Sequence, residues 1–255
     1  MNEATIPATS ALLDLSGETA LVTGASGNIG SAIAERLADA GASIIAHYHR
    51  NAGAARNLVE RLGQGDVVQA DLSTEKDVDG LFAGCRPTLV VHNAASQPVA
   101  GLGDMTFDDW QRMMAANLDS TFLVTQRAAL AWQAAGVPGA IVNIGSTEGL
   151  DPAAGHGHYA TSKAGLLMLT RAAALEFGSA NIRVNCVSPG LTDRDGLARD
   201  WPDGVQRWLD RVPLGRIGSP NDVADAVLFL LSPAARYISG ANLIVDGGMS
   251  AQSKW

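Results

Sequence analysis

The stretch Thr19-Ala20-Leu21-Val22-Thr23-Gly24-Ala25-Ser26-Gly27-Asn28-Ile29-Gly30 decides how this chain folds. A short apolar run leads into a glycine-rich turn, and a helical pattern follows in which Ile29, Ile33 and Leu37 share one side. Such a turn brings backbone N–H groups and a helix N-terminus against a pyrophosphate, because glycine leaves room for the close approach. An ordinary tight turn is the alternative interpretation.

The residues after the next apolar run, 43–48, bear on which dinucleotide would bind. This second run makes the first unit a β-α-β motif, and an acidic residue after it would bind the adenosine ribose hydroxyls of NAD. The chain has His49 and Arg50 there, and these side chains could meet the 2′-phosphate of NADP. We therefore expect NADP(H), with NAD(H) possible. The alternative is that Arg50 is a solvated charge at the start of the next helix.

Strand and helix patterns alternate through the rest of the chain without a linker, repeat or low-complexity break. The alternation predicts one α/β domain, 17–255, with a single doubly wound parallel sheet and helices on both faces. A mobile or loosely docked arm, 1–16, precedes it. The expected helices are 52–62, 75–82, 107–135, 159–177 and 222–231. The expected later strands are 67–69, 88–91, 140–145, 182–187 and 241–245.

Candidate chemistry lies in the stretch 143–163, where Ser146 ends an apolar run and Tyr159 and Lys163 follow a glycine-rich loop. Tyr159 and Lys163 are four residues apart, so on a helix they share one face. An ammonium beside a phenol lowers the phenol pKa, which would make Tyr159 a general acid or base for a carbonyl or an alcohol. An exposed tyrosine beside a solvated lysine is the alternative.

Two other polar residues, Asp71 and Asn117, each allow two interpretations. Asp71 follows a strand and could accept a hydrogen bond from an adenine amino group, or could N-cap the helix that begins at Glu75. Asn117 interrupts a long helix despite its poor helix propensity, which indicates a structural or catalytic role unless it lies on the surface.

The segment 193–213, which follows the sixth strand, differs in composition from the rest of the chain. It carries charges, glycines and the tryptophans Trp201 and Trp208, which is typical of a mobile substrate lid. A surface helix with both tryptophans packed inward is the alternative. His156 and His158, just before Tyr159, belong either to the wall of the substrate cleft or to a polar loop, and Trp255 has no assigned role.

Composition excludes several classes of protein. The chain has 255 residues, 47% of them hydrophobic, and a net charge of −8 without a basic cluster, which argues against nucleic-acid binding. Cys85 and Cys186 have no metal-like spacing and are expected to be reduced thiols. Residues 1–16 show no secretion signal, and no apolar run is long enough to span a membrane. We therefore expect a cytoplasmic protein that acts on a small molecule.

Taken together, these motifs resemble the short-chain dehydrogenase/reductase family over about residues 16–249. The family implies NAD(P)-dependent hydride transfer between a nicotinamide and a carbonyl or secondary alcohol, with strand order 3-2-1-4-5-6-7. It also implies a homotetramer or dimer formed through helices 107–135 and 159–177. The matching segments are 23–30, Asn93-Ala94-Ala95, Asn117, Ser146, Tyr159-x-x-x-Lys163, Pro189-Gly190 and Asp246-Gly247-Gly248.

The resemblance also implies a role for each matching residue. Tyr159 would be the acid/base and Ser146 would polarise the substrate oxygen. Lys163 would lower the tyrosine pKa and bind the nicotinamide ribose, and Asn117 would hold a water in a proton relay. The implied cofactor contacts are Gly24, Ser26, Asn28, Ile29 and Gly30 at the pyrophosphate, Asp71 and Leu72 at the adenine, Asn93 and Ala94 at the adenosine-side ribose and bridge, and Pro189, Gly190 and Thr192, with Tyr159 and Lys163, at the nicotinamide end.

The chain departs from the family pattern at the glycine turn. Asn28 replaces the usual glycine, and Gly27 stands where NADP-binding members often carry arginine, so the NADP(H) expectation rests on His49 and Arg50. The stretch 47–50 is similar to that of the pteridine reductases, which use NADPH but commonly have Asp in place of Ser146. A carbonyl reductase, a pteridine-type C=N reductase, a 3-oxoacyl-ACP reductase and a dinucleotide-binding regulator with little turnover therefore remain as alternatives.

Overall fold

The architecture is a single parallel sheet between two layers of helices. The computed structural model describes residues 7–252. In this part of the chain, seven strands pair in the order β3-β2-β1-β4-β5-β6-β7, which confirms the predicted doubly wound arrangement. The strands are β1 (Thr19–Val22), β2 (Ser43–Tyr48), β3 (Asp66–Gln69), β4 (Leu89–His92), β5 (Gly139–Ile144), β6 (Ile182–Pro189) and β7 (Asn242–Val245).

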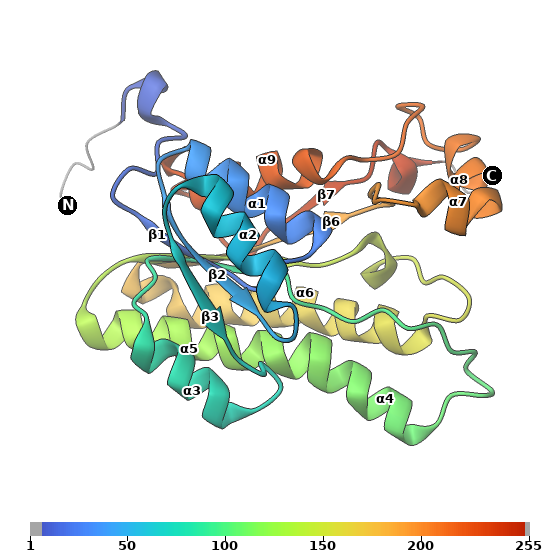
Figure 1. Ribbon diagram of the computed structural model, residues 1–255, viewed down its shortest axis with the longest axis horizontal. Coiled ribbons are helices and arrows are strands. Elements are labelled where there is room, and N and C mark those ends of the chain that lie inside the picture. The colour runs from blue at the N-terminus through green and yellow to red at the C-terminus, as the bar shows by residue number, and fades with distance from the viewer. Residues whose placement is uncertain (1–6, 253–255) are drawn as a thin grey trace.

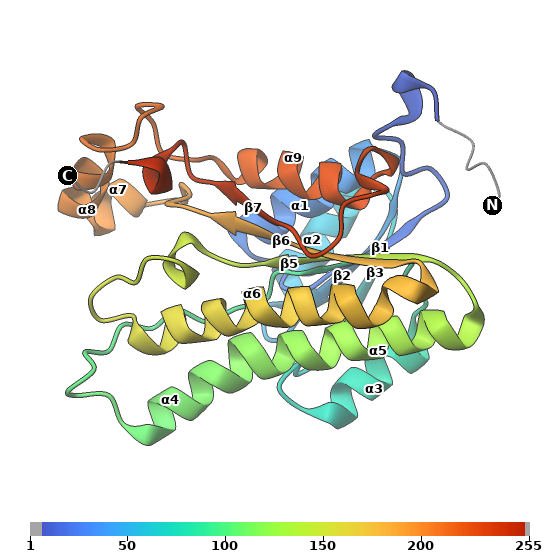
Figure 2. The same cartoon turned by 180° about the vertical axis from the view of Figure 1, so that it is seen from behind.

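Helices cover both faces of the sheet. In Figures 1 and 2, α1, α2 and α9 lie on one face, and α3, α5 and α6 lie on the other. Because the strands are parallel, their carboxyl ends meet at one edge of the sheet, where open α/β folds bind ligands. The main helices are α1 (Asn28–Asp39), α2 (Ala52–Leu62), α3 (Glu75–Gly84), α4 (Phe107–Met114), α5 (Ser120–Ala135), α6 (Gly157–Phe177), α7 (Leu197–Asp200), α8 (Pro202–Leu209) and α9 (Pro220–Leu231).

The core consists of two apolar clusters, one on each face of the sheet. Successive side chains of a strand point to opposite faces of the sheet, which explains the division. In β1, Ala20 and Val22 pack in one cluster with α1 and α9, whereas Leu21 packs in the other. Strand β4 follows the same rule, with Val91 on the first side and Val90 on the second. Because both faces are buried, the strands read as continuous apolar runs.

The predicted long helix 107–135 is helical throughout but irregular in its middle. Helix α4 begins with a capping box, in which Thr106 and Asp109 satisfy each other's backbone N–H groups. A π-helical segment, Ala115–Asp119, then joins α4 to α5. Asn117 lies within this segment, which explains why a residue of poor helix propensity interrupts the pattern.

The described N-terminal segment packs on the domain through two leucines. Leu15 is buried, its N–H donates to the carbonyl oxygen of Ala40, and the carbonyl oxygen of Leu12 accepts a hydrogen bond from Ala234. Leu12 and Leu15 therefore connect this segment to the domain, whereas residues 1–6 of the predicted arm and Trp255 lie outside the described residues. No helix within 7–252 is long and apolar enough to cross a membrane.

Candidate active site

The turn between β1 and α1 is built for close approach. Gly24 has a φ of +63°, and a Cβ on Gly30 would lie 2.3 Å from the carbonyl oxygen of Gly24, so neither position has room for a side chain. Gly27 is the N-cap of α1 and provides no side-chain cap, which leaves the N–H groups of the first helical turn open to an anion. Ser26 and Asn28 border this exposed helix start. The arrangement fits the pyrophosphate of a dinucleotide.

The segment after β4 holds the turn in place. The Thr23 hydroxyl accepts hydrogen bonds from the N–H groups of Asn93 (2.9 Å) and Ala94 (3.0 Å). The Asn93 amide donates to the carbonyl oxygens of Thr23 (3.1 Å) and Gly24 (3.3 Å). The structure therefore brings together the predicted residues Gly24, Asn93 and Ala94, and it uses the Asn93 side chain to support the turn.

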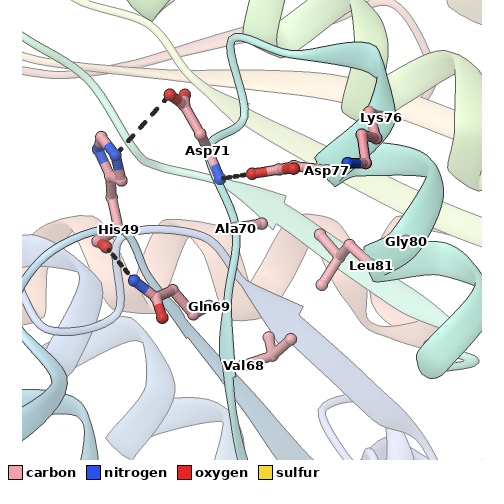
Figure 3. A pocket seen from close by; sticks show the side chains of 9 residues that line it. All are labelled: His49, Val68, Gln69, Ala70, Asp71, Lys76, Asp77, Gly80 and Leu81. Carbon is pink, nitrogen blue, oxygen red and sulfur yellow. Dashed lines mark hydrogen bonds and ion pairs between the residues drawn. The ribbon is translucent and has the colours of Figure 1, made fainter.

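Two of the predicted adenosine-side residues, His49 and Asp71, line a pocket of about 500 Å³ next to β3 and α3 (Figure 3). His49 Nε2 lies 3.8 Å from a carboxylate oxygen of Asp71. Hydrogen bonds from the hydroxyl and N–H of Ser73 lower the pKa of Asp71. Leu72, the residue after Asp71, is buried.

Two sequence interpretations at this end are corrected by the structure. The N-cap of α3 is Thr74, whose hydroxyl accepts from the N–H of Asp77, so Asp71 is not the cap. Arg50 does not begin a helix, because α2 starts at Ala52 with Asn51 as its N-cap. Arg50 is exposed in the connecting segment.

The pocket also contains Lys76, a residue that the sequence did not single out. Lys76 and Gln69 line it together with His49 (Figure 3), and the Gln69 amide donates to the carbonyl oxygen of His49 at 3.1 Å. Lys76 follows Asp71 by five residues and is the second residue of α3. Once the end of β3 is known, this spacing could have identified Lys76 as a residue near the adenine side.

Three predicted catalytic residues meet at the carboxyl edge of the sheet. Strand β5 delivers Ser146, and the first two turns of α6 present Tyr159 and Lys163. The Ser146 hydroxyl lies close enough to the Tyr159 phenol to lower the pKa of that phenol, and its oxygen accepts from the N–H of Glu148 at 3.1 Å. Tyr159 is 8% exposed, which excludes the interpretation of an exposed tyrosine.

Lys163 lies under this pair. It is 3% exposed, so it is not a solvated lysine. Its Nζ donates to the carbonyl oxygen of Ile144 at 2.7 Å and lies 5.6 Å from the centre of the Tyr159 ring. Burial lowers the pKa of Lys163 to about 8.

The pKa of Tyr159 departs from the sequence expectation. Burial raises the pKa of Tyr159 to about 12, the Ser146 hydrogen bond lowers it by less, and the Glu148 carboxylate raises it further. The net shift of the Tyr159 pKa is thus opposite to the expected lowering, and the role of Lys163 in tuning the phenol stays a prediction. The reason is that desolvation outweighs the Ser146 hydrogen bond and the Glu148 charge acts in the same direction as burial, while the Lys163 ammonium donates to Ile144.

Asn117 is a buried junction, not a surface residue. Its side-chain oxygen accepts from the N–H of Ser96 at 2.8 Å, and its amide donates to the carbonyl oxygen of Ser96 at 2.9 Å. The amide also lies within hydrogen-bond distance of Ser162 Oγ (3.2 Å) and Met113 Sδ (3.0 Å). The side chain therefore ties the segment after β4 to α6, one turn from Tyr159. Its role in a water relay stays a prediction.

The predicted nicotinamide end lies where β6 finishes at Pro189. The N–H of Gly190 donates to the carbonyl oxygen of Val245, and the Thr192 hydroxyl lies 3.3 Å from the carbonyl oxygen of Gly190. A Cβ on Gly190 would lie 2.7 Å from the Trp208 ring. The lid is thus seated directly on Gly190.

The two lid tryptophans differ from each other. Trp208 is half-buried against Gly190, whereas Trp201 is 48% exposed and stacks with the Arg207 guanidinium at 5.9 Å. The lid therefore matches neither interpretation fully, because one ring packs inward and the other faces solvent. Asn28 also contacts the lid, since its amide donates to the carbonyl oxygen of Asp193 at 2.6 Å.

A polar cluster that the sequence missed lies beside Tyr159. One Glu148 oxygen is 2.7 Å from His156 Nδ1, and the other accepts from the Gln97 amide at 3.2 Å. The His156 ring meets the Tyr159 ring edge-on, with centres 6.1 Å apart. His158 is fully buried, and neither ring nitrogen has a hydrogen-bond partner among residues 7–252.

Comparison with known proteins agrees with this geometry. A family model described as enoyl-(acyl carrier protein) reductase matches residues 24–250. The chain is 34% identical to 3beta-hydroxysteroid dehydrogenase 1 of Eggerthella lenta, over 93% of this chain and 95% of that protein. A putative 2-deoxy-D-gluconate 3-dehydrogenase of Agrobacterium tumefaciens with bound NADP superposes with a TM-score of 0.88, at 32% identity and with 94% and 99% of the two chains covered. A 7α-hydroxysteroid dehydrogenase complexed with NADH and 7-oxo glycochenodeoxycholic acid gives 0.89, at 34% identity and with 95% and 98% covered.

Proposed function

The chain belongs to the short-chain dehydrogenase/reductase family, and on that premise we propose that it transfers a hydride between a nicotinamide cofactor and a carbonyl or secondary alcohol substrate. The observation that carries the proposal is the contact of Ser146 with Tyr159 above buried Lys163, at the carboxyl edge of the sheet. An intact catalytic set argues against a dinucleotide-binding regulator with little turnover.

In the proposed mechanism, Tyr159 and Ser146 act as a pair of hydrogen-bond donors to the substrate oxygen. The Ser146 oxygen accepts from the N–H of Glu148, which orients the hydroxyl, and its O–H would turn from the Tyr159 phenol to the substrate oxygen and polarise it. Tyr159 transfers the proton, and a phenol whose pKa is raised to about 12 is protonated near neutral pH. In the reductive direction this protonated Tyr159 would be the general acid, and in the oxidative direction its phenolate would be the general base.

The residues that would hold the cofactor follow the same edge. The first turn of α1, with Ser26 and Ile29, would bind the pyrophosphate, and Asp71 would face the adenine. Lys163 would bind the nicotinamide ribose, with Asn117 placing α6 and contributing to a proton relay. The bound nicotinamide would supply or accept the hydride.

We assign NADP(H) as the preferred cofactor, with NAD(H) possible, because no carboxylate follows β2 and both His49 and Arg50 are exposed there. Arg50→Ala should raise the Kd of NADPH by about tenfold and leave that of NADH nearly unchanged, since a charge-assisted contact to the 2′-phosphate is lost. Arg56→Ala, an exposed arginine on α2, is the matched control. Equal losses for both cofactors would refute the assignment.

The substrate class can be tested with a panel of carbonyl and C=N compounds. The absorbance of reduced nicotinamide should fall when the enzyme and NADPH meet a ketone, and no oxidation with any carbonyl would refute the proposed function. An acyl thioester is a second candidate, because the matching family description names an acyl-carrier reductase and exposed Val99, Leu102, Leu150 and Leu214 provide apolar surface. Dihydropteridines belong in the panel as the C=N alternative.

We further propose a homotetramer, or a dimer, formed through α5 and α6. These helices lie side by side in both views (Figures 1 and 2) and expose Phe122, Leu130, Met168 and Leu175, the last at 83%. Sedimentation of the wild type should give a multiple of the chain mass, and Leu175→Lys should lower it. A monomeric wild type would contradict this assembly.

A further inference from the structure

The imidazole of His47 links two strand ends that flank β2. It is 1% exposed and is the penultimate residue of β2. Its Nδ1 lies 3.2 Å from the backbone nitrogen of Gly24, in the glycine turn. Its Nε2 lies 3.1 Å from the carbonyl oxygen of Ala70, directly before Asp71. One ring thus bridges the phosphate turn and the adenine-side segment.

The two partners fix the state of the ring. The N–H of Gly24 can only donate, so Nδ1 must carry a lone pair, and the Ala70 carbonyl can only accept, so Nε2 must carry the proton. His47 is therefore neutral, in the Nε2–H form. Burial also lowers the pKa of His47, which supports the neutral ring.

The backbone of His47 reinforces the same connection. Its carbonyl oxygen accepts from the N–H of Ala25 at 3.0 Å, so two successive N–H groups of the turn are bound to one residue. Gly24 has a positive φ, and the N–H of Ala70 donates to the neighbouring Tyr48 carbonyl. The ring adds the one polar side chain among the buried residues of β2, where Ile44, Ile45 and Ala46 are otherwise apolar.

We propose that His47 is a positioning residue for the dinucleotide, which sets the phosphate turn at a fixed distance from the adenine-side segment. The inference rests on the proposed function. A histidine placed only for core packing needs no such pair of partners, because an aliphatic side chain fills a buried strand position without requiring hydrogen bonds. The two contacts instead join two loops, one that would hold the pyrophosphate of the dinucleotide and one that would hold its adenine.

A pair of substitutions separates the two contacts. The amide of His47→Asn reaches the position of Nδ1 and can still accept from Gly24, whereas that of His47→Gln reaches the position of Nε2 and can still donate to Ala70. Each variant loses one hydrogen bond, so urea denaturation should show similar stabilities. Fluorescence titration with NADPH should give a Kd within about threefold of wild type for His47→Asn. For His47→Gln it should be roughly tenfold or more weaker, because the Gly24 N–H loses its partner.

The outcomes distinguish this inference from the proposed function. Wild type that binds neither NADPH nor NADH would overturn the proposed function and this inference with it. Wild type that binds while both variants bind equally well, or lose affinity only in proportion to lost stability, would overturn this inference alone. If a variant does not fold, the nitrogen shifts of His47 in ¹⁵N-histidine-labelled wild type still test it. A protonated Nδ1, or a ring unaffected by added NADPH, would contradict the assignment.

Discussion

Gly190→Ala should displace the lid, because three carbon atoms already surround the position that the new methyl group would take. That Cβ would lie 2.7 and 2.8 Å from two carbons of the Trp208 ring and 2.8 Å from Cβ of Asp246. Carbon atoms in contact lie about 3.5–4.0 Å apart, so the overlap is on the order of 1 Å. A Cβ cannot rotate away, so either the lid or the segment after β7 must move. Overpacking of this kind costs about 1–3 kcal/mol.

Urea denaturation of five proteins tests this reasoning: wild type, the two single variants Gly190→Ala and Trp208→Ala, their double variant and one control. Gly190→Ala should lower the free energy of unfolding in the wild type and cost less in a Trp208→Ala background, where two of the three contacts are absent. Gly80→Ala is the control, since no atom lies within 4 Å of its Cβ and alanine in helix α3 should stabilise by about 0.5–1 kcal/mol. Equal costs in both backgrounds, or no cost in either, would refute the placement of Trp208 on Gly190.

Two further predictions concern the cofactor turn and the buried histidine of β4. Gly30→Ala should weaken NADPH binding by about tenfold or more in a fluorescence titration, because its Cβ would lie 2.3 Å from the Gly24 carbonyl oxygen; unchanged affinity would argue against a tight turn. Burial lowers the pKa of His92 from its ordinary 6.5 to about 3. The unfolded chain therefore takes up that proton first, and the free energy of unfolding should fall between pH 6.5 and 3 by up to about 1.4 kcal/mol per pH unit. His92→Asn should show a shallower slope in urea denaturation, and an identical slope would contradict the assignment.

Much of the fold could be predicted because it depends on local pattern. Apolar runs buried on both faces, alternating with helices, indicate a parallel sheet, and the confirmed strand order follows the family resemblance. The spacing of Tyr159 and Lys163 placed both on one face of α6, because a helix repeats about every four residues. Ser146 could be placed at the site because β5 ends just before it.

The rest depended on tertiary packing, which no local pattern encodes. The contact from Asn28 to Asp193 joins residues 165 apart, and the contact from Gln97 to Glu148 joins residues 51 apart. The direction of the Tyr159 pKa shift could not be predicted, because the spacing of Tyr159 and Lys163 does not reveal how deeply the phenol is buried.

The central claim is that Tyr159 transfers the proton during hydride transfer. The direct measurement is a single-turnover experiment, in which enzyme loaded with NADPH is mixed with its best carbonyl substrate and the decay of reduced nicotinamide is followed. Tyr159→Phe should slow this step by about 10²–10⁴-fold, because the general acid is lost, while the Kd of NADPH stays near the wild-type value. Tyr237→Phe, at a fully exposed tyrosine, is the control and should be unaffected. A Tyr159→Phe enzyme that oxidises NADPH at the wild-type rate would contradict the account.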